Sequence, residues 1–201
     1  MSEFERWQDR FAAKDYVFGE APNAFLASKA SLLPKQGRAL AVADGEGRNG
    51  VWLAEQGLDV LSIDFSPNAQ AKARALAERR GVTLRFELVD VHAFDYPQDV
   101  FDVVVDIFSQ FSSPAQRAPK WAGMKRALKP GGLLLLEGYT PKQLEFGTGG
   151  PRNVENLYTR PLLEQAFGDL PKIEIAEYEA VLSEGAGHSG LSAVIDLVGW
   201  K

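Results

Sequence analysis

Cysteine is absent from this chain of 201 residues, which excludes disulfide bonds, a thiolate nucleophile and cysteine-based metal sites. Histidine is scarce as well, because only His92 and His188 occur, and their spacing does not suit a metal site. No apolar run approaches the roughly 20 residues that a membrane span requires, and the first residues lack the basic and apolar segments of a signal peptide. We therefore expect a cytoplasmic protein that binds neither a metal nor a membrane.

An excess of positive charge is also missing. The chain has 22 basic and 27 acidic residues, so its net charge is −5. Proteins that bind nucleic acids need clustered Lys and Arg for the phosphates, but the densest basic clusters here, Arg79–Arg80 and Lys125–Lys129, fall near the ends of predicted helices, where cations favour the helix dipole. We expect no nucleic-acid partner. No heptad pattern appears either, and we expect a monomer or a weak dimer.

Apolar strands alternate with helices along most of the chain, which predicts a doubly wound α/β fold with a mostly parallel, seven-stranded sheet. Strands are expected at 38–43, 59–63, 83–89, 100–107 and 133–137, and helices at 49–56, 67–80 and 113–128, with Pro119 a candidate break. A glycine-rich loop at 139–156 and a helix at 160–167 precede two strands, 172–182 and 191–199. The loop 183–190 joins them as an antiparallel hairpin. The apolar positions change phase near Ala176, which predicts a β-bulge.

The first 30 residues are rich in aromatic side chains. Phe4, Trp7 and Phe11 have the spacing of one apolar helix face. We expect a helix and a lid segment over residues 1–30, within a single domain that spans residues 1–201.

A glycine-rich turn between two predicted strands is the most informative local signal. The first strand is followed by Gly45, Gly47 and Gly50, and the second ends at Asp64. Glycines let the backbone turn sharply and approach a ligand closely, and a carboxylate at a strand tip is well placed to accept hydrogen bonds from a ribose. The pattern indicates a cofactor that contains a nucleoside. Because Gly45-x-Gly47-x-x-Gly50 also matches the dinucleotide fingerprint, NAD(P) stays open at this point.

Motifs outside the glycine turn narrow the choice. They are Lys129–Gly132 before the fifth strand, the terminal hairpin, the run Phe101–Asp106 and the strand that ends at Asp64. These features resemble the class I S-adenosylmethionine (SAM)-dependent methyltransferases. Further residues resemble the small bacterial branch related to tellurite-resistance and thiopurine methyltransferases: Trp7, Tyr16, Phe18–Glu20, Pro22–Asn23, Gly45–Asn49 and Leu136–Gly138. The resemblance implies SAM as the cofactor and a small-molecule methyl acceptor.

The resemblance also implies roles for single residues. Gly45 and Gly47 would carry the turn under the methionine part of SAM, Asp64 would hold the ribose hydroxyls, and Phe65 would lie against the adenine. The other residues implied at the cofactor are Tyr16 as a lid, Asp44 or Glu46 at the ammonium group, Asn49, Asp90 and Val91 at the adenine, and Ile107 and Phe108 near the sulfonium. Structural alternatives stay open, since Asn49 can cap a helix, Tyr16 can pack on the sheet and Asp90 can lie in a surface loop. Arg48 is expected to be a solvated or sheet-edge cation.

The chain departs from the pattern of this family at two positions. The family usually has an acidic residue four positions before Gly45 and a glycine two positions before it, whereas this chain has Ala41 and Ala43. A protein that binds SAM without catalysis is therefore an alternative, and an NAD(P)-dependent oxidoreductase is a weaker one.

A general base is needed only if the acceptor is a nitrogen or oxygen nucleophile. His188, in the expected hairpin loop, is the candidate catalytic residue, with Asp106 and Glu137 as further candidates; a buried Asp106 would need polar partners. The loop with Thr148–Arg152 is a candidate receptor for a carboxylate or phosphate.

Overall fold

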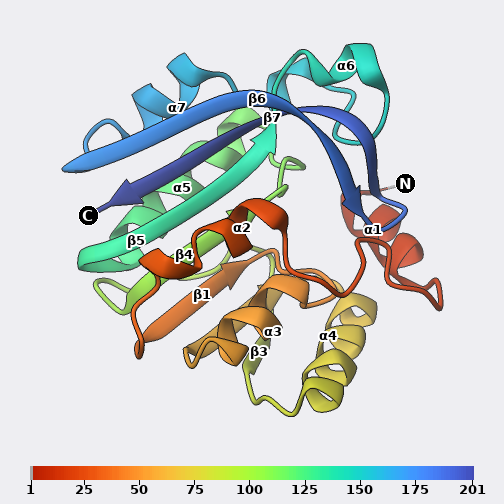
Figure 1. The fold of residues 1–201 in the computed structure, drawn as a ribbon, viewed down its shortest axis with the longest axis vertical. Coiled ribbons are helices and arrows are strands. Elements are labelled where there is room, and N and C mark those ends of the chain that lie inside the picture. Colours follow the sequence, from red (N-terminus) through yellow and green to blue (C-terminus); the bar gives the residue numbers. More distant parts are fainter. Residues whose placement is uncertain (1) are drawn as a thin grey trace.

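A seven-stranded sheet forms the centre of the molecule in a computed structural model that describes residues 2–201 (Figure 1). The strands lie in the order β3-β2-β1-β4-β5-β7-β6. β1 to β5 are parallel, and β7 is antiparallel to both β5 and β6. Their bounds are β1 Arg38–Val42, β2 Asp59–Asp64, β3 Arg85–Leu88, β4 Phe101–Ile107, β5 Leu128–Tyr139, β6 Lys172–Glu184 and β7 His188–Trp200. This topology confirms the predicted fold class.

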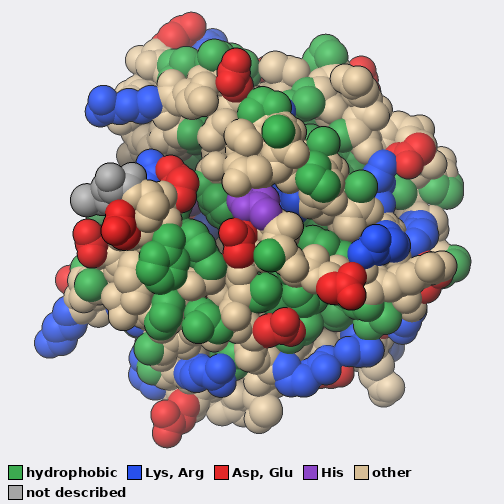
Figure 2. All heavy atoms as spheres, turned by 180° about the vertical axis from the view of Figure 1, so that it is seen from behind, with side chains coloured by type: hydrophobic (Ala, Val, Ile, Leu, Met, Phe, Trp, Pro, Cys, Tyr) green, Lys and Arg blue, Asp and Glu red, His purple; other side chains and the backbone are tan. Residues whose placement is uncertain are grey.

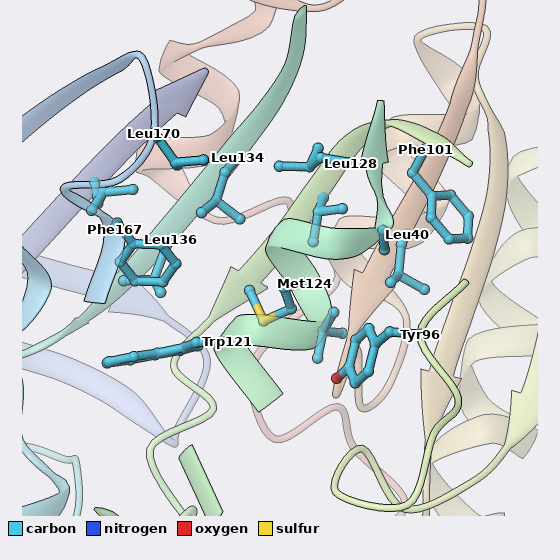
Figure 3. Packing of buried hydrophobic residues seen from close by; sticks show 14 of the residues in the cluster. Leu40, Tyr96, Phe101, Trp121, Met124, Leu128, Leu134, Leu136, Phe167 and Leu170 are labelled. Atoms are coloured by element: carbon cyan, nitrogen blue, oxygen red, sulfur yellow. The ribbon is translucent and has the colours of Figure 1, made fainter. Parts of the chain in front are cut away.

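Helices cover both faces of the sheet. On one face, α2 (Ala24–Ser28), α3 (Arg48–Glu55) and α4 (Pro67–Arg80) pack on residues such as Val60 and Val105. On the other, α5 (Pro114–Ala127) and α7 (Arg160–Phe167) bury Trp121, Met124 and Phe167 against leucines of β1 and β5 (Figure 3). The remaining elements are α1 (Glu3–Phe11), α6 (Gln143–Phe146) and two 3₁₀ helices, Ala30–Leu32 and Val154–Asn156. No helix within residues 2–201 is long and apolar enough to cross a membrane.

Local signals place most helix ends correctly. Ser66 caps α4 by accepting a hydrogen bond from the backbone of Ala69, and Gly81 ends the same helix in the left-handed conformation. The candidate break at Pro119 was wrong, since α5 runs through it. Pro119 removes only one intrahelical bond, and the buried side chains of Trp121 and Met124 keep the following turns against the sheet.

Two expectations for the hairpin were also wrong. The register between β6 and β7 is unbroken from Lys172, opposite Trp200, to Glu184, opposite His188, so no bulge occurs near Ala176. β6 is an edge strand whose first half packs toward α5 and α7, whereas Leu182 packs in a different cluster. The apolar positions therefore change face without a slip in register. Because the strands extend further than expected, His188 lies in β7 and not in a loop.

Candidate active site

A cavity opens at the carboxyl ends of the parallel strands β1, β2 and β4, the usual ligand position in open α/β sheets. Its lining comprises Trp7, Phe11, Phe18, Ala43, Asp44, Gly45, Arg48, Asn49, Asp64, Phe65, Ile107, Phe108, Ser109, Phe111 and His188. We call it the strand-tip cavity. On the face drawn in Figure 2, basic and acidic side chains are interspersed, and a histidine lies in a hollow near the centre.

The turn after β1 needs its two glycines for different reasons. Gly45 and Gly47 have φ of 57° and 87°, a region that favours glycine. A Cβ on Gly47 would lie 2.6 Å from Cβ of Ala73 in α4, so this glycine also lets α3 approach α4. Ala43 has φ of 49° without being glycine, so the first position of the motif is strained.

Asp64 lies in the wall of the strand-tip cavity, at the end of β2. Its carboxylate accepts hydrogen bonds from the backbone N–H of Gly45 at 2.9 Å and of Ser66 at 2.8 Å. Burial raises the pKa of Asp64 to about 6, against the effect of these hydrogen bonds. A carboxylate oxygen has more than one lone pair, so each can still accept a hydrogen bond from a ligand hydroxyl.

Asp44 and Glu46, the acids next to Gly45, form hydrogen bonds and an ion pair with other residues of the protein. Asp44 accepts hydrogen bonds from the N–H of Gly50 at 3.0 Å and from the hydroxyl of Ser62 at 2.7 Å, and burial raises its pKa to about 7. Glu46 is paired with Lys72 at 2.7 Å and accepts a hydrogen bond from the backbone of Val17, so it ties the N-terminal segment to the turn. Asp44 lines the cavity and Glu46 does not.

The structure brings together eight of the expected site residues in the strand-tip cavity: Asp44, Gly45, Asn49, Asp64, Phe65, Ile107, Phe108 and His188. Five others do not line it: Tyr16, Glu46, Gly47, Asp90 and Val91. Tyr16 donates its hydroxyl to the backbone carbonyl of Lys72. Asp90 accepts a hydrogen bond from the N–H of His92 at 2.9 Å, and Val91 is buried in the core. The adenine contacts of Asp90 and Val91 and the lid role of Tyr16 stay predictions.

A second cavity adjoins the first. We call it the outer cavity. The two share Trp7, Phe18, Phe108, Phe111 and His188. The ring of His188 lies 4.3 Å from that of Phe108 and 4.5 Å from that of Phe18, measured between centroids. Sequence reasoning assigned Phe18 only to the family resemblance and missed Phe111, because only the fold brings α1, the β4–α5 loop and the terminal hairpin together.

His188 stands on β7 directly opposite Glu184, with its Nδ1 atom 3.8 Å from the Glu184 carboxylate. Desolvation lowers the pKa of His188, so the ring is neutral at neutral pH. A proton on Nδ1 faces the carboxylate, and this tautomer leaves Nε2 as the nitrogen able to accept a proton.

Behind His188 lies a buried polar network. Arg48, in α3, pairs with Glu184 at 2.7 Å and is 7% exposed, so the expectation of a solvated or sheet-edge cation was wrong. The amide of Asn23, which is fully buried, donates to Glu137 and Glu184. Glu137 is thus held by Asn23, and burial together with Asp196 and Glu184 raises its pKa.

A buried lysine supports the loop after β4. Asp106, the candidate base in β4, is fully buried and lies 3.0 Å from the ammonium of Lys120. Lys120 also donates to the hydroxyl of Ser109 at 2.6 Å. Sequence reasoning expected Asp106 to need partners but did not identify Lys120. Together they hold the loop in which Phe108 adopts a φ of 55°.

Part of the chain is similar to known methyltransferases. Residues 39–132 match the family model described as "Methyltransferase domain". A demethylmenaquinone methyltransferase of Thermus thermophilus is 36% identical over 113 residues, which is 55% of this chain and 51% of the relative. A protein of the same description from Deinococcus radiodurans is 34% identical over 106 residues, or 52% and 44% of the two chains. The chain thus spans about half the length of these curated relatives.

Solved structures agree on the fold. A protein described under "Conversion of a Disulfide Bond into a Thioacetal Group during Echinomycin Biosynthesis" aligns with a TM-score of 0.76 at 19% identity and covers 99% of this chain and 91% of that one. TehB from Haemophilus influenzae aligns with a TM-score of 0.70 at 17% identity, over 98% and 66% of the chains.

Proposed function

Because the chain contains a methyltransferase domain and has the fold of the class I SAM-dependent methyltransferases, we propose that it transfers a methyl group from SAM to a small-molecule nucleophile. The observation that carries this proposal is the pair of adjoining cavities. One lies at the strand tips with the glycine turn and Asp64. The other adjoins it at the shared side chains, whose aromatic members we call the aromatic wall: Trp7, Phe18, Phe108 and Phe111. Such a pair can hold a methyl donor and an acceptor on two sides of one junction.

The residues of the strand-tip cavity fit SAM. Gly45 lines it and allows close approach of the backbone, and Asp64 retains lone pairs for ribose hydroxyls. The aromatic wall suits a sulfonium, because ring faces attract cations. When bound, SAM supplies an electrophilic methyl group on a good leaving group.

The side chains of this protein would position the two reactants, exclude water from between them and accept a proton. The aromatic side chains of the shared wall exclude water from the junction. The Lys120–Asp106 pair fixes the loop that carries Phe108, so that the wall keeps its shape. For a nitrogen or oxygen acceptor, Nε2 of His188 takes the proton; a soft acceptor such as a thiolate needs no base.

Calorimetric titration with SAM, S-adenosylhomocysteine and NAD tests the proposal. We expect the first two to bind and NAD not to bind, and S-adenosylhomocysteine to be released when an acceptor panel is added. A thermal scan at about 100 times the dissociation constant is a parallel check, since binding then stabilises the fold by about 2.7 kcal/mol. Binding of NAD alone, or of none of the three, would contradict the proposal.

A non-catalytic SAM-binding protein is the second candidate, and the strained Ala43 favours it. Binding of SAM with no release of S-adenosylhomocysteine from any acceptor would support this candidate over methyl transfer.

A further inference from the structure

The outer cavity carries positive charge that the protein does not neutralise. Arg6, Arg10 and Arg152 line it, with Glu3 as the only acid in the lining. Glu3 pairs with Arg6 at 2.6 Å. Within residues 2–201, neither Arg10 nor Arg152 forms an ion pair. The guanidinium of Arg10 lies over the rings of Trp7 and Phe18, at 5.2 and 5.0 Å from their centroids. Two guanidinium groups are therefore left for an anion.

The lining also contains polar atoms without partners. Trp7 Nε1, Tyr139 Oη and Asn156 Oδ1 are buried and make no hydrogen bond within the described residues, and all three residues line the outer cavity. Buried polar groups are normally paired, so a cluster of unpaired ones calls for an explanation.

Flat apolar surface completes the lining. The rings of Phe108 and Tyr139 are stacked with centroids 4.6 Å apart. Tyr139 lies close under the loop at Gly150, where a Cβ would come within 2.8 Å of the ring. With Trp7, Phe18 and Phe111, these rings line the cavity and give it apolar aromatic surface against which a planar molecule can pack.

We propose that the outer cavity binds the methyl acceptor, and that this acceptor is a planar aromatic molecule with a carboxylate or phosphate group held by Arg10 and Arg152. This inference rests on the proposed function. Guanidinium groups bind such anions by paired, charge-assisted hydrogen bonds. The ring would pack in the aromatic wall, with the nucleophilic atom at the junction beside His188.

Methyl transfer to such an acceptor forms one bond and breaks another. A lone pair of the acceptor nitrogen or oxygen forms the bond to the methyl carbon, and the bond between that carbon and sulfur breaks with its electrons passing to sulfur. The proton of the acceptor passes to Nε2 of His188. The products are the methylated acceptor, S-adenosylhomocysteine and protonated His188, which returns its proton to solvent.

Calorimetry with simple probes tests the assignment without turnover. The probes are 2-naphthoate and phenyl phosphate as planar anions, 2-naphthamide as a neutral match and acetate as an anion without a ring, each added to the full chain saturated with S-adenosylhomocysteine. We expect at least one planar anion to bind, and 2-naphthamide and acetate to bind at least tenfold more weakly. Higher salt should weaken the binding of the anions only.

Variants then assign the anion to its residues. Arg10→Gln and Arg152→Gln should each weaken binding of the planar anion about tenfold, and the double variant should abolish it. Arg85→Gln, which removes an exposed arginine from β3, is the matched control and should change nothing. An unchanged affinity for S-adenosylhomocysteine would show that each variant is folded.

Equal binding of 2-naphthoate and 2-naphthamide, binding of no probe, or affinities insensitive to both arginine substitutions would overturn the assignment of the acceptor. If S-adenosylhomocysteine still bound, methyl transfer would stand as the proposed function. Failure of S-adenosylhomocysteine to bind would instead count against the proposed function, so the two failures are distinguishable.

Discussion

His188 illustrates, at the scale of one residue, how position decides chemistry. A histidine in an exposed loop would titrate near its ordinary pKa, whereas His188 is buried among rings and its pKa is lowered. It is therefore neutral at neutral pH and can accept a proton. The neighbouring residue Glu184 forms an ion pair with Arg48. This pairing helps to keep the Glu184 carboxylate ionised.

We predict that His188→Gln lowers turnover of nitrogen or oxygen acceptors by about 10²- to 10⁴-fold, the usual contribution of a general base. Glutamine keeps a polar side chain in the same place but cannot take up a proton at neutral pH. The affinity for SAM should change little, and turnover of a thiol acceptor should persist. Release of S-adenosylhomocysteine and calorimetry provide the two readouts, and His92→Gln is the matched control. An equal loss with thiol and nitrogen acceptors would mean that His188 serves packing alone.

At the scale of secondary-structure elements, the glycine turn positions two helices as well as a ligand. Gly47 precedes α3, and its missing side chain allows Ala73 of α4 to come close. The same turn places Gly45 in the cavity wall and in hydrogen-bond contact with Asp64. A change at Gly47 therefore acts on helix packing first and on the cavity second.

We predict that Gly47→Ala lowers the free energy of unfolding by about 2–4 kcal/mol, from overpacking against Ala73 and from a positive φ that alanine disfavours. Urea unfolding of the ligand-free protein measures this loss. Gly81→Ala is a matched control, because Gly81 has a positive φ but nothing within 4 Å of a Cβ, and it should cost only about 1 kcal/mol. Equal losses in the two variants would refute the role of close helix packing.

For the whole molecule, the sequence predicts the sheet better than the site. The strands, the terminal hairpin and the position of Asp64 follow from local patterns: apolar runs, glycine turns and a carboxylate at a strand tip. The outer cavity depends on contacts between α1, the loop around Gly150 and the β6–β7 hairpin, which are far apart in the chain. In the sequence, Lys120 is one cation of a predicted helix, and only the fold shows that it pairs with Asp106. Such pairings depend on tertiary packing, which no local pattern encodes.

Burial of carboxyl groups across the molecule also sets how its stability depends on pH. Burial raises the pKa of Asp44 from 3.8 to about 7, so between these values the folded state binds more protons than the unfolded state. Stability then falls as pH rises. The lowered pKa of each histidine acts in the opposite direction below its ordinary value of 6.5, so the effect of Asp44 must be isolated by a variant.

We therefore predict that Asp44 alone makes the ligand-free protein about 2 kcal/mol more stable at pH 5.5 than at pH 7.5. Asp44→Asn retains an oxygen that can accept a hydrogen bond from Gly50 but does not titrate. The loss of stability between pH 5.5 and pH 7.5 should therefore be about 2 kcal/mol smaller in this variant than in the parent. Urea unfolding of both proteins at the two pH values measures the difference. Asp95→Asn, which alters a fully exposed side chain, should leave the pH dependence of the parent unchanged. If Asp44→Asn and the parent showed the same pH dependence, Asp44 would have to be ionised in the folded state at pH 5.5, and the carboxylate beside the glycine turn would be charged throughout the range in which a cofactor binds.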